Sequence, residues 1–151
     1  MDTITTERAI HRAMCRYAQA LDQRQWQLLD DVFAVDATAW YGGEHAVAGR
    51  VAIVALIRSF LDGCGPTQHL LGNLQVERLS ADTADSVCYV RAGHRGASGR
   101  EVAEYTVYGA YRASWQLDAT GWRAQQWRLE VFWSSGDASI LGQVPVTAAT
   151  E

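Results

Sequence analysis

The sequence predicts an α+β domain in which N-terminal helices cover one curved, mostly antiparallel sheet. Two observations lead to this fold class. Apolar residues recur at helical spacing in the first third of the chain, and four long runs with strand-like alternation fill the second half. The 151 residues fit a single domain with a sizeable core, which we place at 1–143, with a loose tail over 144–151.

Three helical segments are expected. The first begins at a capping Thr5 or Thr6, a second short helix covers about 26–33, and a third covers 50–62. The sequence GCGP at 63–66 ends the third helix, because glycine suits the C-terminal position and proline cannot continue the helix. A strand that runs into a glycine turn is expected at 36–43. The apolar side of the first helix is formed by Ile10, Met14, Tyr17 and Leu21.

The four strand-like runs cover 67–79, 84–95, 101–116 and 122–134, and turn sequences separate the last three. In the fourth run, alternation places Trp127, Leu129, Val131 and Trp133 on one face. We expect the open face of the sheet to be partly apolar, with Trp115, Trp127 and Trp133 available. This predicts a homo-dimer or homo-trimer.

Charge and composition argue against several classes of protein. The net charge of −4 and the scattered arginines disfavour nucleic-acid binding. No stretch approaches the roughly 20 apolar residues of a membrane span. The N-terminus also lacks the cationic start and apolar segment of a signal peptide, so a cytoplasmic protein is expected.

The sequence contains no motif that predicts a bound cofactor or metal ion. All 13 basic residues are arginines, which excludes Schiff-base chemistry on a lysine. Cys15, Cys64 and Cys88 form no CxxC pair and no two histidines have the spacing of metal ligands, so no metal is predicted. GxSxG and GxGxxG motifs are absent as well.

Asp22 and His69 are the leading candidates for chemistry, since a carboxylate that orients an imidazole makes a proton-transfer device near neutral pH. Asp22 ends the first predicted helix, where the helix dipole would raise the pKa of its carboxyl. It could instead cap the second helix together with Gln25, or be a solvated turn residue. His69 begins an apolar strand, where a lone histidine is more often structural.

The order of elements resembles the nuclear transport factor 2-like fold, a cone-shaped α+β barrel with three N-terminal helices on a strongly curved mixed sheet. The motifs resemble its SnoaL-like branch. They are YAQALDQRQWQLLDDVFAVDATAWYGG (17–43), GR (49–50), QHLLGN (68–73) and EYTVYGAYRASW (104–115). That branch and its relatives include scytalone dehydratase, a bile-acid dehydratase, a hexachlorocyclohexane dehydrochlorinase and polyketide cyclases.

The resemblance implies roles for particular residues. Asp22 and His69 stand at the positions of the catalytic Asp and His of several of these lyases. Tyr17 and Tyr41 match two tyrosines of the bile-acid enzyme, and Tyr17 replaces a lysine of the dehydrochlorinase, which argues against halide elimination. His94 matches the second histidine of scytalone dehydratase by spacing. The residues expected to contact substrate are His94, Asn73, Trp40, Tyr108, Arg128 and Trp127.

Two functions are therefore expected from the sequence. The first is a cofactor-independent lyase or isomerase, dehydratase- or cyclase-like, that acts on a small hydrophobic carbonyl or hydroxylated compound through an Asp–His pair. The alternative is a non-catalytic small-molecule binding or subunit-assembly protein of the same fold, because fold alone does not fix function. The place where the Asp22 carboxylate points distinguishes the two.

Overall fold

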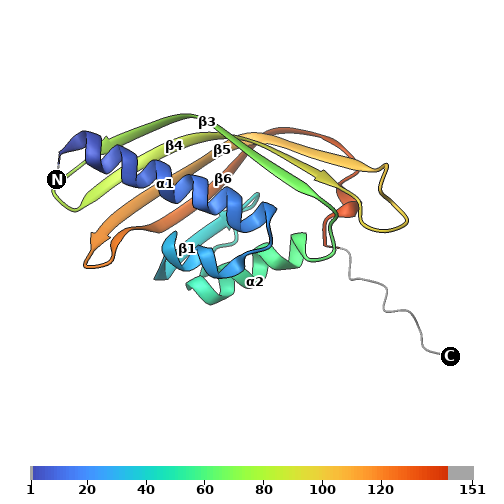
Figure 1. Ribbon diagram of the computed structural model, residues 1–151, viewed down its shortest axis with the longest axis horizontal. Helices are drawn as coiled ribbons and strands as arrows, with labels where there is room; N and C mark the ends of the chain where they lie inside the picture. The colour runs from blue at the N-terminus through green and yellow to red at the C-terminus, as the bar shows by residue number, and fades with distance from the viewer. Residues whose placement is uncertain (1, 143–151) are drawn as a thin grey trace.

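The computed structural model describes residues 2–142, so the predicted loose tail over 144–151 lies outside the described residues. The chain forms helices first and long strands afterwards, as predicted (Figure 1). The second predicted helix is a short 3₁₀ helix. The helical elements are α1 (Thr3–Asp22), η1 (Trp26–Asp31), α2 (Arg50–Leu61) and η2 (Ala138–Ile140). The strands are β1 (Phe33–Tyr41), β2 (Val47–Ala48), β3 (Thr67–Arg78), β4 (Thr83–Arg95), β5 (Glu104–Asp118) and β6 (Gly121–Gly136).

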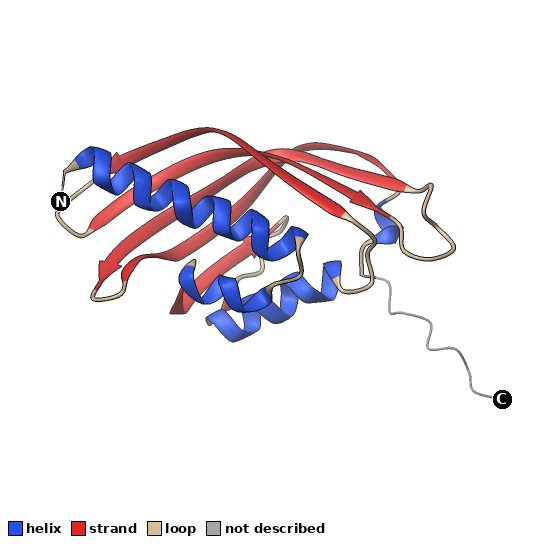
Figure 2. Cartoon of the chain, viewed as in Figure 1, coloured by secondary structure: helices blue, strands red, loops and turns tan. Residues whose placement is uncertain are grey.

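One six-stranded sheet carries the fold, in the order β2-β1-β6-β5-β4-β3. Every pair is antiparallel except β1 with β6, which is parallel, so the sheet is mixed and mostly antiparallel as expected. The sheet is strongly curved, and α1, η1 and α2 all lie on its concave side (Figure 2). The interior therefore lies between these helices and the concave face.

Helix α1 begins earlier than the sequence suggested. Its N-cap is Asp2, whose carboxylate accepts a hydrogen bond from the Thr5 backbone N–H at 2.7 Å. Thr6 is instead buried in the first turn. The predicted cap at Thr5 or Thr6 is therefore wrong, because the side chain of Asp2, three residues before Thr5, satisfies a free N–H group of the first turn. The predicted apolar stripe is buried along its whole length.

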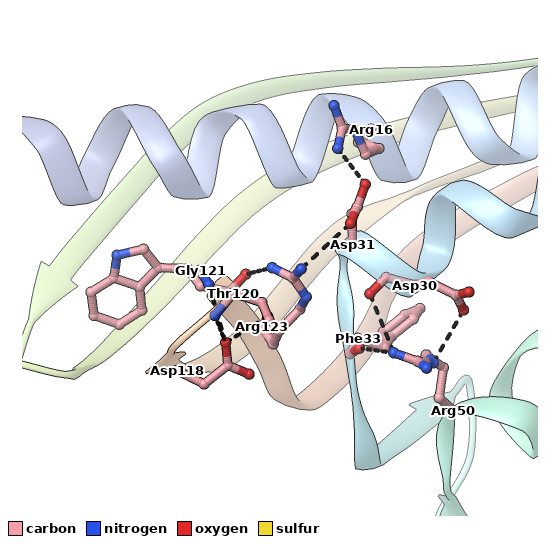
Figure 3. A network of polar contacts seen from close by, with 10 residues as sticks. Arg16, Asp30, Asp31, Phe33, Arg50, Asp118, Thr120, Gly121 and Arg123 are labelled. Atoms are coloured by element: carbon pink, nitrogen blue, oxygen red, sulfur yellow. Dashed lines mark hydrogen bonds and ion pairs between the residues drawn. The ribbon is translucent and has the colours of Figure 1, made fainter.

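Ion pairs fix η1 to the rest of the molecule (Figure 3). Asp31 contacts Arg16 of α1 at 2.5 Å and Arg123 of β6 at 3.4 Å, and Asp30 contacts Arg50 of α2 at 3.2 Å. The carboxylates are well exposed, so each pair adds roughly 1 kcal/mol at most to stability. They nevertheless connect η1 to three other elements, α1, α2 and β6.

A β-bulge overturns part of the predicted face pattern. Between Tyr108 and Gly109 of β5 the register shifts, so that Gly109 pairs with Val131 while Tyr108 pairs with Trp133. Phe132 is the extra residue, and beyond it the side chains of β6 change sides. Trp133 consequently lies on the convex face, stacked on Tyr108 with ring centroids 4.7 Å apart.

The tryptophans expected on the open face are mostly in the core. Trp115 is 2% exposed and Trp127 is 0% exposed, whereas Trp133 is 58% exposed. The expectation was wrong for Trp115 and Trp127 because they point toward the concave face, which the helices cover. Trp127 packs on Tyr17, Phe33 and Tyr111 as the centre of an aromatic cluster.

Candidate active site

A cavity of about 380 Å³ opens between the helices and the concave face of the sheet. Most of its wall is apolar. The apolar side chains come from α1, α2, the sheet and the residue after η2: Leu21, Ile57, Phe60, Leu61, Ala92, Val107, Leu129, Val131 and Leu141. The polar side chains are two histidines and four tyrosines: His69, His94, Tyr17, Tyr41, Tyr105 and Tyr111.

Asp22 and His69 meet at the wall of this cavity. Asp22 is the last residue of α1, and His69 is the third residue of β3. Asp22 Oδ1 lies 2.7 Å from His69 Nδ1, and Asp22 Oδ2 accepts the backbone N–H of His69 at 2.8 Å. The imidazole is buried, with its side chain 4% exposed, whereas the Asp22 side chain is 23% exposed. One carboxylate therefore holds both the backbone and the ring of the histidine.

The Asp22 carboxylate does not cap η1. The N-cap residue there is Gln25, which makes no side-chain capping bond, so the capping alternative for Asp22 is wrong. The expected rise in the pKa of Asp22 is also wrong. Burial, the largest single influence, raises this pKa, but hydrogen bonds from His69, the charge of His69 and a hydrogen bond from Thr67 together bring it below the ordinary value. Asp22 is therefore ionised at neutral pH.

An ionised carboxylate only accepts hydrogen bonds, so the 2.7 Å contact requires a proton on Nδ1 of His69. The lone pair is then on Nε2, the ring nitrogen that Asp22 leaves free. If Nε2 takes up a proton, the carboxylate stabilises the resulting imidazolium. This arrangement makes His69 suited to act as a base toward a molecule in the cavity.

His94 faces the same cavity from β4 and is buried, not exposed near the hairpin as its position in the sequence allowed. Its ring lies edge-on to that of His69, with centroids 5.7 Å apart. His94 Nδ1 donates to the backbone oxygen of Tyr105 at 2.9 Å, which again leaves Nε2 as an acceptor. Burial lowers the pKa of His94, as does the nearby charge of His69, so the ring is neutral.

Three of the four tyrosines on the wall, Tyr17, Tyr41 and Tyr111, interact with one another. The hydroxyls of Tyr17 and Tyr41 are 2.9 Å apart, and the rings of Tyr17 and Tyr111 meet edge-to-face at 5.1 Å. Burial raises the pKa of all three hydroxyls well above the ordinary value, and the neighbouring tyrosines add to the effect. These groups therefore stay protonated and are hydrogen-bond donors over the whole physiological range.

The model of the SnoaL-like domain family matches residues 2–128 of this chain. The chain belongs to the SnoaL-like family. The family that the sequence motifs pointed to is thereby confirmed, as is its cone-shaped α+β fold. No curated protein sequence matches the chain.

Solved structures share this SnoaL-like fold over almost the whole chain. A proposed aromatic ring hydroxylase from Novosphingobium aromaticivorans is 25% identical, with a TM-score of 0.82, and the match covers 93% of this chain and 99% of the other. A proposed scytalone dehydratase from the same organism is 23% identical, with a TM-score of 0.79 and 89% of each chain covered. A hexachlorocyclohexane dehydrochlorinase is 19% identical, with a TM-score of 0.79 and coverages of 95% and 96%.

Five residues expected to contact substrate lie elsewhere in this SnoaL-like domain. Asn73 is exposed with a φ of 51°, at a β-bulge of β3 where the ladder to β4 shifts, so it leaves the face of His69. Arg128 stacks over Trp40 on the convex side, 4.5 Å from the ring centroid. Tyr108 stacks on Trp133 on that side as well, and Trp127 belongs to the core. None of these five lines the cavity.

Other residues of the site were missed by the sequence reasoning. Tyr111 lies on the cavity wall, and its signal was available, because strand alternation already placed it with Tyr105 and Val107 on one face. Thr67 donates to Asp22 Oδ1 at 3.0 Å, and Arg24 binds Thr67 at 2.9 Å. For Thr67 the only signal is its position two residues before His69 on the same strand.

Among residues 2–142 the structure brings together no group of three or more His, Cys, Asp or Glu side chains that could hold a metal ion. No helix in this range is long and apolar enough to cross a membrane.

Proposed function

We propose that this protein is a cofactor-independent lyase or isomerase that removes a proton next to a carbonyl in a small hydrophobic compound. The proposal depends above all on the 2.7 Å contact between Asp22 Oδ1 and His69 Nδ1 in the wall of an apolar cavity. A positioned base of this kind contributes typically 10²–10⁴-fold to rate. The water-poor surroundings strengthen its electrostatic interactions further.

In the proposed reaction, Nε2 of His69 takes a proton from the carbon next to the carbonyl. The electrons of the broken C–H bond move into the carbonyl group and form an enolate. Asp22, ionised, stabilises the imidazolium that results. The proton on His69 then goes to a leaving hydroxyl, which departs as water in a dehydration, or to another carbon in an isomerisation.

Tyr17 and Tyr41 are the proposed donors to the carbonyl oxygen, where negative charge develops. Their hydroxyls form one hydrogen bond with each other, and this leaves one hydroxyl proton of the pair for a substrate. Preorganised donors of this type are worth most where water is excluded. His94, neutral and with Nε2 as acceptor, is suited to receive a hydrogen bond from a substrate hydroxyl.

The cavity limits the substrate class. Its volume of about 380 Å³ is near the lower end for small-molecule sites, and its wall is mainly aliphatic and aromatic. No arginine or lysine lines it among the described residues, which disfavours phosphorylated or strongly anionic substrates. A compound of one or two rings with a carbonyl and a hydroxyl group meets these conditions. Dehydration is our preferred reaction, and isomerisation or cyclisation use the same groups.

The names of two similar structures agree with this choice. The proposed scytalone dehydratase and the hexachlorocyclohexane dehydrochlorinase are both named for elimination reactions. We do not propose dehydrochlorination for this chain. By its resemblance to the dehydrochlorinase, Tyr17 occupies the position of a lysine in that enzyme.

A test that needs no natural substrate uses nitrobenzisoxazole, which opens to a coloured cyanophenolate when a base removes its ring C–H proton. We expect saturable ring opening by the wild-type protein and a loss of about 10²-fold or more in His69→Ala. His11→Ala, at an exposed position of α1, is the matched control and should keep full activity. Equal rates for wild type and His69→Ala would refute the proposal.

The alternative, a non-catalytic binding protein with the same cavity, gives a different result. It predicts saturable binding of a hydrophobic fluorescent probe that cavity variants such as Ile57→Trp abolish, with no ring opening of nitrobenzisoxazole by any variant.

A screen of small hydroxy-ketones in D₂O, followed by mass spectrometry, separates the two types of reaction. Elimination gives loss of water, whereas isomerisation gives deuterium uptake alone.

A further inference from the structure

Arg24 lies just beyond the end of α1 in an unusual backbone conformation. Its φ is 55°, in the left-handed region that residues other than glycine, asparagine and aspartate seldom occupy. Its backbone N–H donates to Leu21 O at 3.3 Å, and the next N–H, of Gln25, donates to Ala20 O at 2.9 Å. This turn directs the Arg24 side chain back across the end of the helix, toward the segment that leads into β3.

The guanidinium of Arg24 binds three groups from two segments. Nη1 donates to Leu21 O at 2.5 Å and to Thr67 Oγ1 at 2.9 Å, and Nη2 donates to Gly65 O at 2.8 Å. The end of α1 and the start of β3 are thereby joined by one side chain. Gly65 is itself held by a backbone hydrogen bond to Arg95 O, at the end of β4.

The contact with Arg24 fixes the direction of the Thr67 hydroxyl. A guanidinium only donates hydrogen bonds, so Thr67 Oγ1 must be the acceptor in that contact. Its own hydroxyl proton is then free for Asp22 Oδ1, which lies 3.0 Å away. Asp22 Oδ1 therefore receives two donors, Thr67 and His69 Nδ1, while Oδ2 receives the His69 backbone N–H.

We propose that Arg24 and Thr67 form a positioning pair for the Asp22–His69 dyad, in which Arg24 orients the Thr67 hydroxyl and Thr67 holds the Asp22 carboxylate in the plane that His69 requires. This inference rests on the proposed function for its consequence in turnover. Asp22 is the last residue of its helix, a place where backbone groups lack helical partners and the end frays. The contacts of Arg24 and Thr67 hold that end against β3.

The first experiment measures the titration of Asp22 without using activity. The Asp22 carboxyl signal is followed by ¹³C NMR against pH, with Asp22→Asn to assign it. Its pKa should rise in Thr67→Val, because a hydrogen bond that lowers this pKa is removed. Thr67→Ser, which keeps the hydroxyl, should restore the wild-type titration. An unchanged titration in Thr67→Val overturns the proposal.

The charged and titratable groups around Asp22 must stay constant in this comparison. They are His69, in direct contact, and Tyr17, Tyr111, His94 and Arg24, which interact with the same region electrostatically. Arg24→Lys keeps the positive charge but has one terminal nitrogen in place of the planar fork whose Nη1 and Nη2 reach Thr67 and Gly65 separately. It should therefore raise the pKa of Asp22 as well, whereas Arg16→Lys, on the exposed side of α1, should not.

A double-mutant cycle tests whether Arg24 acts through Thr67. In Arg24→Lys/Thr67→Val the change in the titration of Asp22 should be no larger than in Thr67→Val alone, because the hydroxyl that Arg24 orients is absent. Additive changes would show that Arg24 acts independently and would overturn the pair. Thermal unfolding of each variant, followed by circular dichroism, verifies that the comparison is between folded proteins.

Ring opening of nitrobenzisoxazole gives the second readout. In Thr67→Val we expect kcat to fall about tenfold with KM nearly unchanged, since small misplacements of a base cost rate more than binding. Thr67→Ser should restore kcat. If the wild type opens no ring, the proposed function fails while the titration still decides the positioning pair. If the wild type is active and Thr67→Val equals it in both readouts, only the positioning pair fails.

Discussion

Asp22 binds His69 at two points, through the ring Nδ1 at 2.7 Å and through the backbone N–H at 2.8 Å. The two carboxylate oxygens are thus used for different purposes. One selects the tautomer of the imidazole, and the other holds the start of β3 against the end of α1. A single residue therefore sets both the protonation pattern and the position of the imidazole.

Replacement of Asp22 by asparagine should therefore remove most of the activity while the fold remains. The amide cannot accept with both of its terminal atoms, so either the ring or the backbone of His69 loses its acceptor. We expect a fall of about 10²–10⁴-fold in the ring-opening rate of nitrobenzisoxazole. Asp62→Asn, which removes an exposed carboxylate at the end of α2, is the control. Near-normal rates in Asp22→Asn would exclude the dyad.

His94 should make the protein less stable in mild acid. Its pKa is lowered in the folded state, chiefly by burial, whereas the unfolded chain protonates it at its ordinary value of about 6.5. Stability is therefore complete above this value and is lost as the pH falls toward the lower folded pKa, because only the unfolded state gains the proton.

Urea unfolding at a series of pH values between about 7 and 5 measures this loss, since the ordinary histidine value lies in that window. His94→Gln should flatten the dependence of the unfolding free energy on pH, and the exposed His45→Gln should leave it as in the wild type. A slope that survives in His94→Gln would assign the effect to another group.

Tyr17→Phe and Tyr41→Phe should each lower kcat on nitrobenzisoxazole about tenfold or more, because each removes one hydroxyl of the proposed donor pair to the developing negative charge. Tyr89→Phe, on the convex face, is the matched control.

The raised pKa values of Tyr17 and Tyr41 lead to a second prediction, on the pH dependence of activity. No decline in activity from tyrosine ionisation should appear below about pH 10, the ordinary value. A decline that starts lower and disappears in Tyr41→Phe would contradict the assignment.

Gly109→Ala should destabilise the fold by ~2 kcal/mol or more, since overpacking at a tight site costs this much. A Cβ at this position would collide with the backbone oxygen of Glu130 on the neighbouring strand, at the bulge that turns Trp133 to the convex face. Gly72→Ala, where a Cβ meets no atom within 4 Å, should change little. Chemical denaturation of the three proteins side by side measures the difference, and equal midpoints would contradict this account of the bulge.

The predicted dimer or trimer would form through the convex face, where large apolar side chains are exposed. Leu70, Tyr89, Phe132 and Trp133 are 60%, 49%, 46% and 58% exposed, respectively. If copies of the chain associate there, Trp133→Glu should shift the molecular mass measured by light scattering toward the monomer. Val102→Glu, at an exposed loop position, should leave it unchanged. A monomeric wild type at micromolar concentration would remove the predicted dimer or trimer.

The sequence was sufficient for the elements whose apolar residues keep one period from end to end. The buried face of α1 and the positions of the four long strands follow from such patterns, and a buried stripe is stabilised whatever its neighbours are. Asn73 and Trp133 were misplaced because a β-bulge inserts a residue and reverses the alternation. Such an insertion depends on the partner strand, which local periodicity does not describe.

For the candidate site, too, one part was predictable from the sequence and another was not. The contact between Asp22 and His69 was expected from a resemblance between motifs, and the geometry of the two residues agrees with it. Thr67 and Arg24 had no signal strong enough to single them out, because their importance arises only where the end of α1 meets the start of β3. A hydrogen-bond chain between segments more than 40 positions apart is a property of the folded chain.

The cavity wall is divided between elements in a way that bears on how such proteins diversify. Helix α2 contributes only aliphatic and aromatic groups, Ile57, Phe60 and Leu61, whereas every polar group on the wall comes from α1 or the sheet. Exchanges on α2 would therefore change the size and shape of the cavity without touching the groups that we propose for proton transfer. Libraries confined to these three positions are thus the natural route to altered selectivity at constant chemistry.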